Sequence, residues 1–143
     1  MFGRNGSYPD PVSDLDFLRE RVPGYADYAD EDHRHLVDPQ MRSYLGEALS
    51  LARERLRPEG ETAEQLDGLL LRCEFSDQRA IRATDHAKFG SALVDRIHAL
   101  DRELVETADR IRDADAQALP ALLDTAARVM DQRFGAIAEA PST

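Results

Sequence analysis

The sequence lacks several features that common functional classes need. It has a single cysteine, Cys73, which excludes an internal disulfide and a cysteine-based zinc site within one chain. The glycines are scattered and form no phosphate-cradling loop, so we predict no cofactor. No apolar run approaches the roughly 20 residues of a membrane-spanning helix. Residues 1–7 hold one arginine and no following apolar stretch, so we expect no secretory signal and a cytoplasmic protein.

Positive charge is also scarce. The chain has 18 lysine and arginine residues against 28 aspartate and glutamate residues, which gives a formal net charge of −10. Nucleic acids and anionic membranes bind clustered cations, and a strongly acidic chain repels both. We therefore predict neither a nucleic acid nor a membrane as a partner.

The sequence does contain an apolar stripe in its second half. The stripe consists of Leu93, Ile97, Leu100, Leu104 and Ile111, with Thr107 in the remaining position. Alternating steps of three and four residues keep these side chains on one side of a helix, which must pack against other helices. At 143 residues the chain has the length of one domain. The stripe therefore predicts an all-α fold.

Two further helices are predicted before the stripe. Asp38 is a suitable N-cap for the first helix, with Pro39 at its first position, and Pro58-Glu59-Gly60 ends it. Thr62 and Gln65 have the spacing of a capping box at the start of the second helix. Because the connection between these helices is so short, we expect them to be antiparallel neighbours.

The region from 75 to 91 leaves two interpretations open. In the first, Ser76 caps a new helix that runs unbroken to about Ala114. In the second, the second helix continues to about Lys88, and a turn at Phe89-Gly90 leads to a third helix with Ser91 as its cap. We favour the second interpretation because it gives helices of comparable length. Whether the second helix ends near Cys73 or near Lys88 stays open.

A last helix is predicted from about Ala116 to Ala138, followed by a short tail at 140–143. Residues 1–38 form an acidic arm in which Ser13 caps one short helix that Pro23-Gly24 ends. The predicted fold is thus an all-α, antiparallel up-down bundle of four main helices in residues 39–139, preceded by this arm. The arm packs either on its own bundle or on a neighbouring chain.

Two Asp-x-x-His pairs are the candidate metal ligands. They are Asp32 with His35, and Asp95 with His98. In di-metal bundles, residues three apart ligate one ion together when both point inward. The stripe places Asp95 and His98 on the outer, solvated side of the third helix, and the other pair precedes the first helix. We therefore predict no metal site, and we keep a metal- or small-ligand-binding bundle as the alternative function.

Several apolar and aromatic residues lie in the arm or outside the main apolar faces of the predicted helices. They are Phe17, Tyr25, Tyr28, Leu51, Leu71, Phe75, Val94 and Val105. Outward apolar residues on helices either widen a core or meet another subunit. We predict a non-enzymatic interaction or structural subunit, self-associating or part of a larger assembly, with no catalytic residues. Its partner is another protein or a second copy, and the competing interpretation is a monomer whose arm closes over this surface.

Overall fold

The computed structural model describes residues 13–74 and 88–141, and these residues form helices and connecting loops without any strand. The elements are α1 (Asp14–Arg21), the 3₁₀ helix η1 (Arg34–Leu36), α2 (Val37–Leu56), α3 (Gly60–Glu74), α5 (Ser91–Asp113) and α6 (Leu119–Ala138). The all-helical prediction is confirmed.

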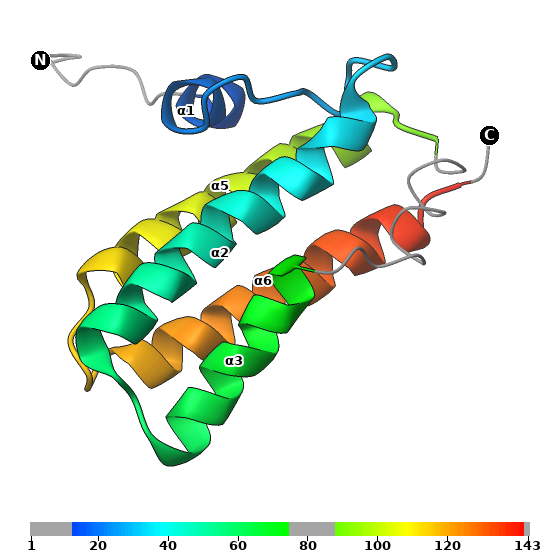
Figure 1. Ribbon diagram of the computed structural model, residues 1–143. Helices are drawn as coiled ribbons and strands as arrows, with labels where there is room; N and C mark the ends of the chain where they lie inside the picture. The colour runs from blue at the N-terminus through cyan, green and yellow to red at the C-terminus, as the bar shows by residue number, and fades with distance from the viewer. Residues whose placement is uncertain (1–12, 75–87, 142–143) are drawn as a thin grey trace, which may run out of the picture.

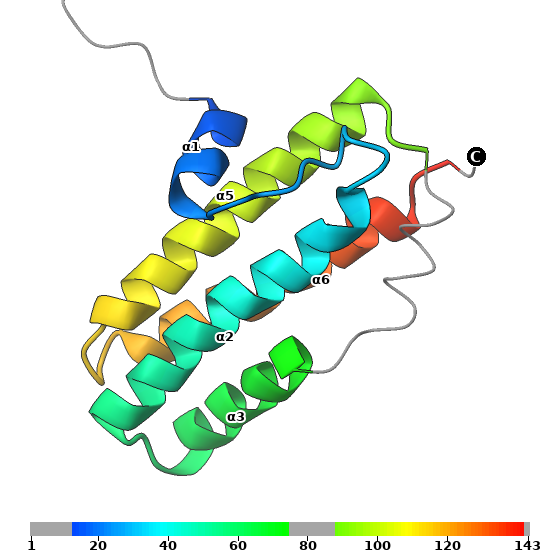
Figure 2. The ribbon, with the colours of Figure 1, turned by 45° about the horizontal axis from the view of Figure 1, so that its top comes forward.

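The four long helices pack as a bundle (Figure 1). α2 contacts α3 and α5, while α6 contacts α5 and α3. α2 and α5 run in one direction, and α3 and α6 run in the opposite direction (Figures 1 and 2). Since the neighbours α2 and α5 are parallel, the bundle is confirmed, but the expectation that all neighbouring helices are antiparallel is not.

The short helix of the arm forms where the sequence predicted it. The Ser13 side chain accepts a hydrogen bond from the Asp16 backbone N–H at 3.1 Å and so caps α1. The helix ends just before Pro23-Gly24, where Gly24 has a φ of 72°. α1 packs against α5 (Figure 2), and Leu18 is fully buried there. The described part of the arm therefore packs on its own bundle.

The start of α2 differs from the prediction. α2 begins at Val37, so Asp38 lies in its first turn, and the prediction of Asp38 as the N-cap is wrong. The reason is that η1 leads directly into α2, so the chain is already helical before Asp38. The Asp38 carboxylate instead accepts hydrogen bonds from Arg42 at 2.8 Å and from Arg133 at 3.3 Å.

The other helix boundaries correct the remaining predictions. α3 begins at Gly60, so the predicted cap Thr62 lies inside the helix. The unbroken helix from Ser76 to Ala114 is wrong, because residues 88–90 are not helical and α5 begins at Ser91. Whether the second helix reaches Lys88 concerns residues 75–87, which lie outside the described residues.

Within residues 13–74 and 88–141, none of the helices combines the length and the apolar character that spanning a bilayer requires.

Two glycines of α3 offer a matched test of the fold. Replacing Gly68 by alanine is expected to stabilise the protein by roughly 0.5–1 kcal/mol, because alanine is the better helix former. A Cβ at Gly68 meets no atom within 4 Å, so nothing opposes this gain. Gly60→Ala should instead destabilise by about 1 kcal/mol, since the φ of Gly60 is +63°. Urea unfolding measures both, and shifts of the same sign would contradict these helix assignments.

Candidate functional site

The most unusual feature of the core is a buried charge on α5. Asp101 is fully buried, and Arg133 of α6 is only 4% exposed. The Nε–H group of Arg133 donates to Oδ1 of Asp101, and the Tyr25 hydroxyl donates to Oδ2 at 2.7 Å. Both carboxylate oxygens of Asp101 therefore have a hydrogen-bond partner from another part of the chain.

Arg133 connects this pair to two more segments. Its Nη1 group donates to Oδ1 of Asp38 at 3.3 Å, and its Nη2 group donates to the Tyr28 hydroxyl at 3.1 Å. We call Asp101, Arg133, Tyr25, Tyr28 and Asp38 the buried polar cluster. Its members come from α5, α6, the arm and α2, so the cluster joins four separate parts of the chain at one point.

The pKa values in the cluster reflect burial and pairing. Burial raises the pKa of the Asp101 carboxyl, although Arg133 and the Tyr25 hydroxyl oppose this shift. Burial would lower the pKa of Arg133, but Asp101 and the other neighbours raise it overall and keep the guanidinium charged. The pKa of Tyr25 is raised by burial and then by the charge of Asp101. Burial also raises the pKa of Tyr28. Both phenols thus keep their protons and serve as hydrogen-bonding groups rather than as bases.

His98 forms a second polar contact between α5 and the arm. Its Nε2 atom lies 2.7 Å from Oδ1 of Asp27, and the edge of the Tyr25 ring meets the imidazole with the ring centroids 6.5 Å apart. His98 is buried, so the prediction that it faces solvent is wrong. The prediction assumed that α5 is covered on one side only, whereas the arm covers the side that carries His98.

The other candidate metal ligands are not arranged around a common site. Asp95 is exposed, as the stripe indicated, and Asp32 and His35 are also exposed. In the part of the chain that the structure describes, no group of three histidine, cysteine, aspartate or glutamate side chains is arranged to hold a metal ion. The four candidate ligands are therefore not brought together in this fold.

Most residues of the predicted interaction surface pack inside the chain. The buried ones are Phe17, Tyr25, Tyr28, Val94 and Val105. Leu51 and Leu71 are exposed, at 43% and 56% of their surface, and Phe75 lies outside the described residues. In this fold, Leu51 and Leu71 are thus the two described members of the set that offer substantial apolar surface to a partner.

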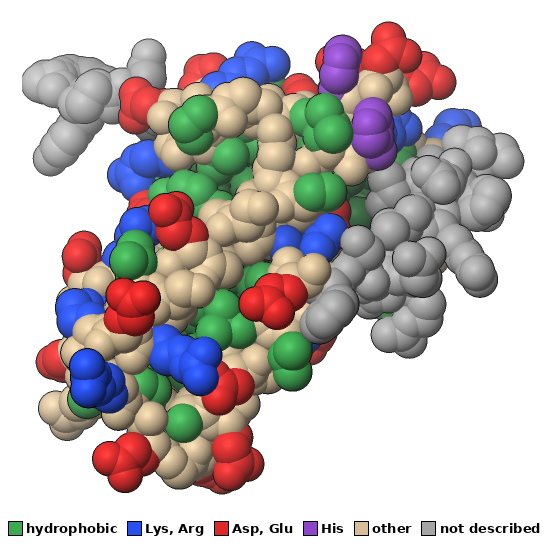
Figure 3. Space-filling model, in the orientation of Figure 1, with side chains coloured by type: hydrophobic (Ala, Val, Ile, Leu, Met, Phe, Trp, Pro, Cys, Tyr) green, Lys and Arg blue, Asp and Glu red, His purple; other side chains and the backbone are tan. Residues whose placement is uncertain are grey.

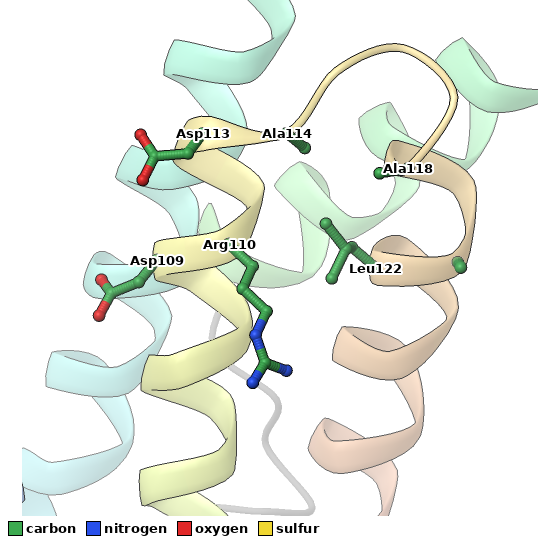
Figure 4. A pocket seen from close by; sticks show the side chains of 7 residues that line it. Asp109, Arg110, Asp113, Ala114, Ala118 and Leu122 are labelled. Atoms are coloured by element: carbon green, nitrogen blue, oxygen red, sulfur yellow. The ribbon is translucent and has the colours of Figure 1, made fainter.

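An open groove lies between the end of α5 and the start of α6 (Figure 4). Its volume is about 580 Å³. Small apolar side chains dominate its lining, with charged residues of α5 along one side. The lining residues are Asp109, Arg110, Asp113, Ala114, Ala118, Ala121 and Leu122. Its size lies within the range of ligand pockets, but it is a surface groove rather than an enclosed cavity.

The helix connection beside this groove is firmly held. Arg55 of α2 donates to the backbone carbonyl groups of Arg112 and Ala114, each at 2.6 Å, and so satisfies the C-terminal end of α5. The Asp115 side chain accepts a hydrogen bond from the Ala118 backbone N–H at 2.8 Å. These contacts preform the groove.

Asp101 and Arg133 are not among the predicted site residues, although the sequence contains a signal for them. A second 3-4 series runs beside the predicted stripe on α5 and is occupied by Val94, Ile97, Asp101, Leu104, Ala108 and Ile111. Arg133 likewise stands at an apolar position of α6, three residues after Met130 and four before Ile137. An acid and an arginine at core positions of two helices indicate a buried pair.

Comparisons with known proteins found no relative of this chain. No protein-family model, curated protein or solved structure matches the chain.

Proposed function

We propose that this chain is a non-enzymatic interaction or structural subunit that contacts other protein chains through its exposed helix faces. One observation carries the proposal: among the described residues, the ionisable groups with the most strongly shifted pKa values lie in the buried polar cluster, where they bind one another. A catalytic acid, base or nucleophile must be within reach of a substrate. Groups that are sealed from solvent and paired within the chain instead hold the fold together.

The accessible apolar surface suits such a contact. Among the described residues it includes the groove between α5 and α6 together with the exposed side chains of Leu36, Leu51 and Leu71. Figure 3 shows hydrophobic, acidic and basic side chains interspersed over one face of the molecule. Because the chain carries a net charge of −10, a partner with a basic surface is favoured at first encounter. Self-association requires apolar contact that outweighs the repulsion between two acidic copies.

The cytoplasm remains our proposed location, because a single cysteine cannot form an internal disulfide and so suits a reducing compartment. Burial raises the pKa of the Cys73 thiol to about 11, so the thiol stays protonated near neutral pH. A protonated, half-buried thiol is a poor nucleophile and packs as a small hydrophobic side chain.

The test is the native mass of the tagged chain in extracts of its source cells. We expect complexes heavier than the 16.0 kDa monomer. The double variant Ala118→Arg/Ala121→Arg places two bulky charges in the groove and should weaken assembly at least roughly tenfold. Leu71→Arg tests the exposed face of α3 separately. Ala99→Arg, at an exposed alanine of α5 outside the groove, is the matched control and should leave assembly unchanged.

Two results would contradict parts of this proposal. An unaltered chain that remains a 16.0 kDa monomer, both in extracts and at high concentration after purification, would remove the contact function. Equal assembly of the groove variant and the Ala99→Arg control would remove the groove as the contact surface and direct attention to Leu71.

A further inference from the structure

The described part of the arm forms a strap over the bundle. We define the strap as residues 13–36, which comprise α1, the loop after it and η1. It runs across α5 toward the start of α2 (Figures 1 and 2). Four polar contacts join the strap to α5. They are Asp14 with Arg102 at 3.2 Å, Arg21 with Asp109, Tyr25 with Asp101 at 2.7 Å, and Asp27 with His98 at 2.7 Å.

The strap depends on docking for its structure. α1 has only eight residues, and an isolated helix of that length is not stable in water. In the loop after α1, the Gln40 side chain of α2 holds the backbone, accepting from the Ala26 N–H and donating to the Gly24 carbonyl, each at 2.8 Å. Loss of these contacts would therefore both detach and unfold the strap in one step.

The polar contacts within the bundle beneath the strap do not depend on it in the same way. Asp101, Arg133 and Asp38 all belong to the long helices, so their mutual contacts do not require the strap. When the strap leaves, water can reach this group, and neither charge becomes buried without a partner. Docking the strap removes that water, and the hydroxyl groups of Tyr25 and Tyr28 replace it.

We propose that the strap is a detachable cover that competes, within the same chain, with a protein partner for one face of α5. Opening uncovers the side of α5 that carries His98 and Asp101, which contact the strap. Val94 and Val105 lie at helical spacing from these two residues, and all four are buried when the strap is docked. A partner that fits this surface presents aromatic side chains with hydroxyl donors, as the strap itself does. The regulatory use of this opening rests on the proposed contact function, whereas the opening itself can be measured without any partner.

The first experiment is native-state hydrogen exchange of the full chain. Amide groups of the strap should exchange through an opening that leaves α2, α5 and α6 protected. Their protection factors should be at least about a hundredfold lower than those of the central α5 amides. Equal protection of the strap and α5 would mean that the strap opens only when the whole protein unfolds, and would overturn the proposal.

The second experiment weakens the strap without removing its aromatic rings. The double variant Tyr25→Phe/Tyr28→Phe deletes the two hydroxyl contacts with Asp101 and Arg133. Gln65→Leu is the control, since it deletes a side-chain hydrogen bond that Gln65 of α3 donates to Asp124 of α6, and neither residue contacts the strap. The probe is a fluorescent synthetic peptide with the sequence of residues 13–36, and its binding to the full chain is followed by anisotropy.

The peptide should bind the double variant at least roughly tenfold more tightly than the unaltered chain, because apparent affinity rises with the open fraction. The Gln65→Leu variant should behave like the unaltered chain, and a scrambled peptide should bind to none of them. Equal affinity for the double variant and the unaltered chain, or equal binding of the scrambled peptide, would overturn the proposal. Should the variant lose its helical circular dichroism, exchange in the unaltered chain still decides the question.

These experiments separate the two ideas. If the chain is monomeric in its source cells but its strap opens, the opening is supported and the proposed contact function is contradicted. If the chain assembles while its strap stays closed, the contact function is supported and the detachable strap is contradicted.

Discussion

Replacing Arg133 by methionine is expected to lower the free energy of unfolding by about 3–5 kcal/mol. Methionine has a similar shape, but it leaves Asp101 fully buried without its cation. It also removes the donor that reaches the Tyr28 hydroxyl. Small domains are stable by only about 5–15 kcal/mol, so this loss is a large part of the total. Urea unfolding followed by circular dichroism measures it.

Two controls identify the cause. Arg128→Met breaks an exposed ion pair with Glu103, whose atoms are 2.7 Å apart, and should cost less than about 1 kcal/mol. Asp101→Leu/Arg133→Met removes both buried charges and should be more stable than Arg133→Met alone. If Arg133→Met costs no more than Arg128→Met, the buried pair does not stabilise the fold as we infer.

The Arg133→Met variant should also change its response to acid. Burial already raises the pKa of Asp101, and loss of the guanidinium removes the main opposing charge. The folded variant would then hold the Asp101 proton at pH values where the unfolded chain releases it. Its stability deficit should therefore shrink as the pH falls and grow as the pH rises through that folded pKa. A deficit that is independent of pH would contradict a buried carboxylate at this position.

Alkaline solution is expected to destabilise the docked strap steeply. The folded-state pKa values of Tyr25 and Tyr28 are raised above the ordinary tyrosine value of about 10, mainly by burial. Above that value the unfolded chain releases two protons that the folded chain keeps, so stability is complete below pH ~10 and falls as the pH rises. The two phenols together should cost about 3 kcal/mol per pH unit above 10.

The measurement compares phenolate absorbance with helical circular dichroism through a titration. The phenolates of Tyr25 and Tyr28 should appear together with each other, as the strap detaches, and no later than the loss of helix from the bundle. Tyr44 is less buried, and its pKa is raised to about 12, so in the folded chain its phenolate appears near the end of the titration. The variant Tyr28→Phe should lose about 1.4 kcal/mol less per pH unit. Ionisation of all tyrosines near pH ~10 with the helices intact would contradict the buried cluster.

The sequence predicted the helices better than it predicted the contacts among them. Ser13 and Ala138 lie at the boundaries expected of them, because capping and helix propensity act over a few neighbouring residues. Asp38 shows the limit of such local reasoning. It is a good N-cap by type, but η1 extends the helical path past it, and its side chain serves Arg42 and Arg133 instead.

The candidate site was missed for a related reason. A search for apolar periodicity passes over Asp101, because an acid normally marks the solvated side of a helix. Its burial depends on Arg133, which lies 32 residues away, and on Tyr25, which lies 76 residues away. His98 was misplaced in the same manner, since only the path of the strap decides that its side of α5 is covered. The path of the strap cannot be predicted from any local sequence pattern.

The buried polar cluster also limits how this sequence can vary in nature. Asp101 and Arg133 can pair in only one register of α5 against α6. A shift of one helical turn, about 5.4 Å, would leave both charges buried without a partner. Natural relatives that lack Asp101 should therefore lack Arg133 as well, and they should carry phenylalanine in place of Tyr25 or Tyr28. These positions should co-vary as a set among homologues, which makes them a signature for recognising distant relatives whose helix surfaces have diverged.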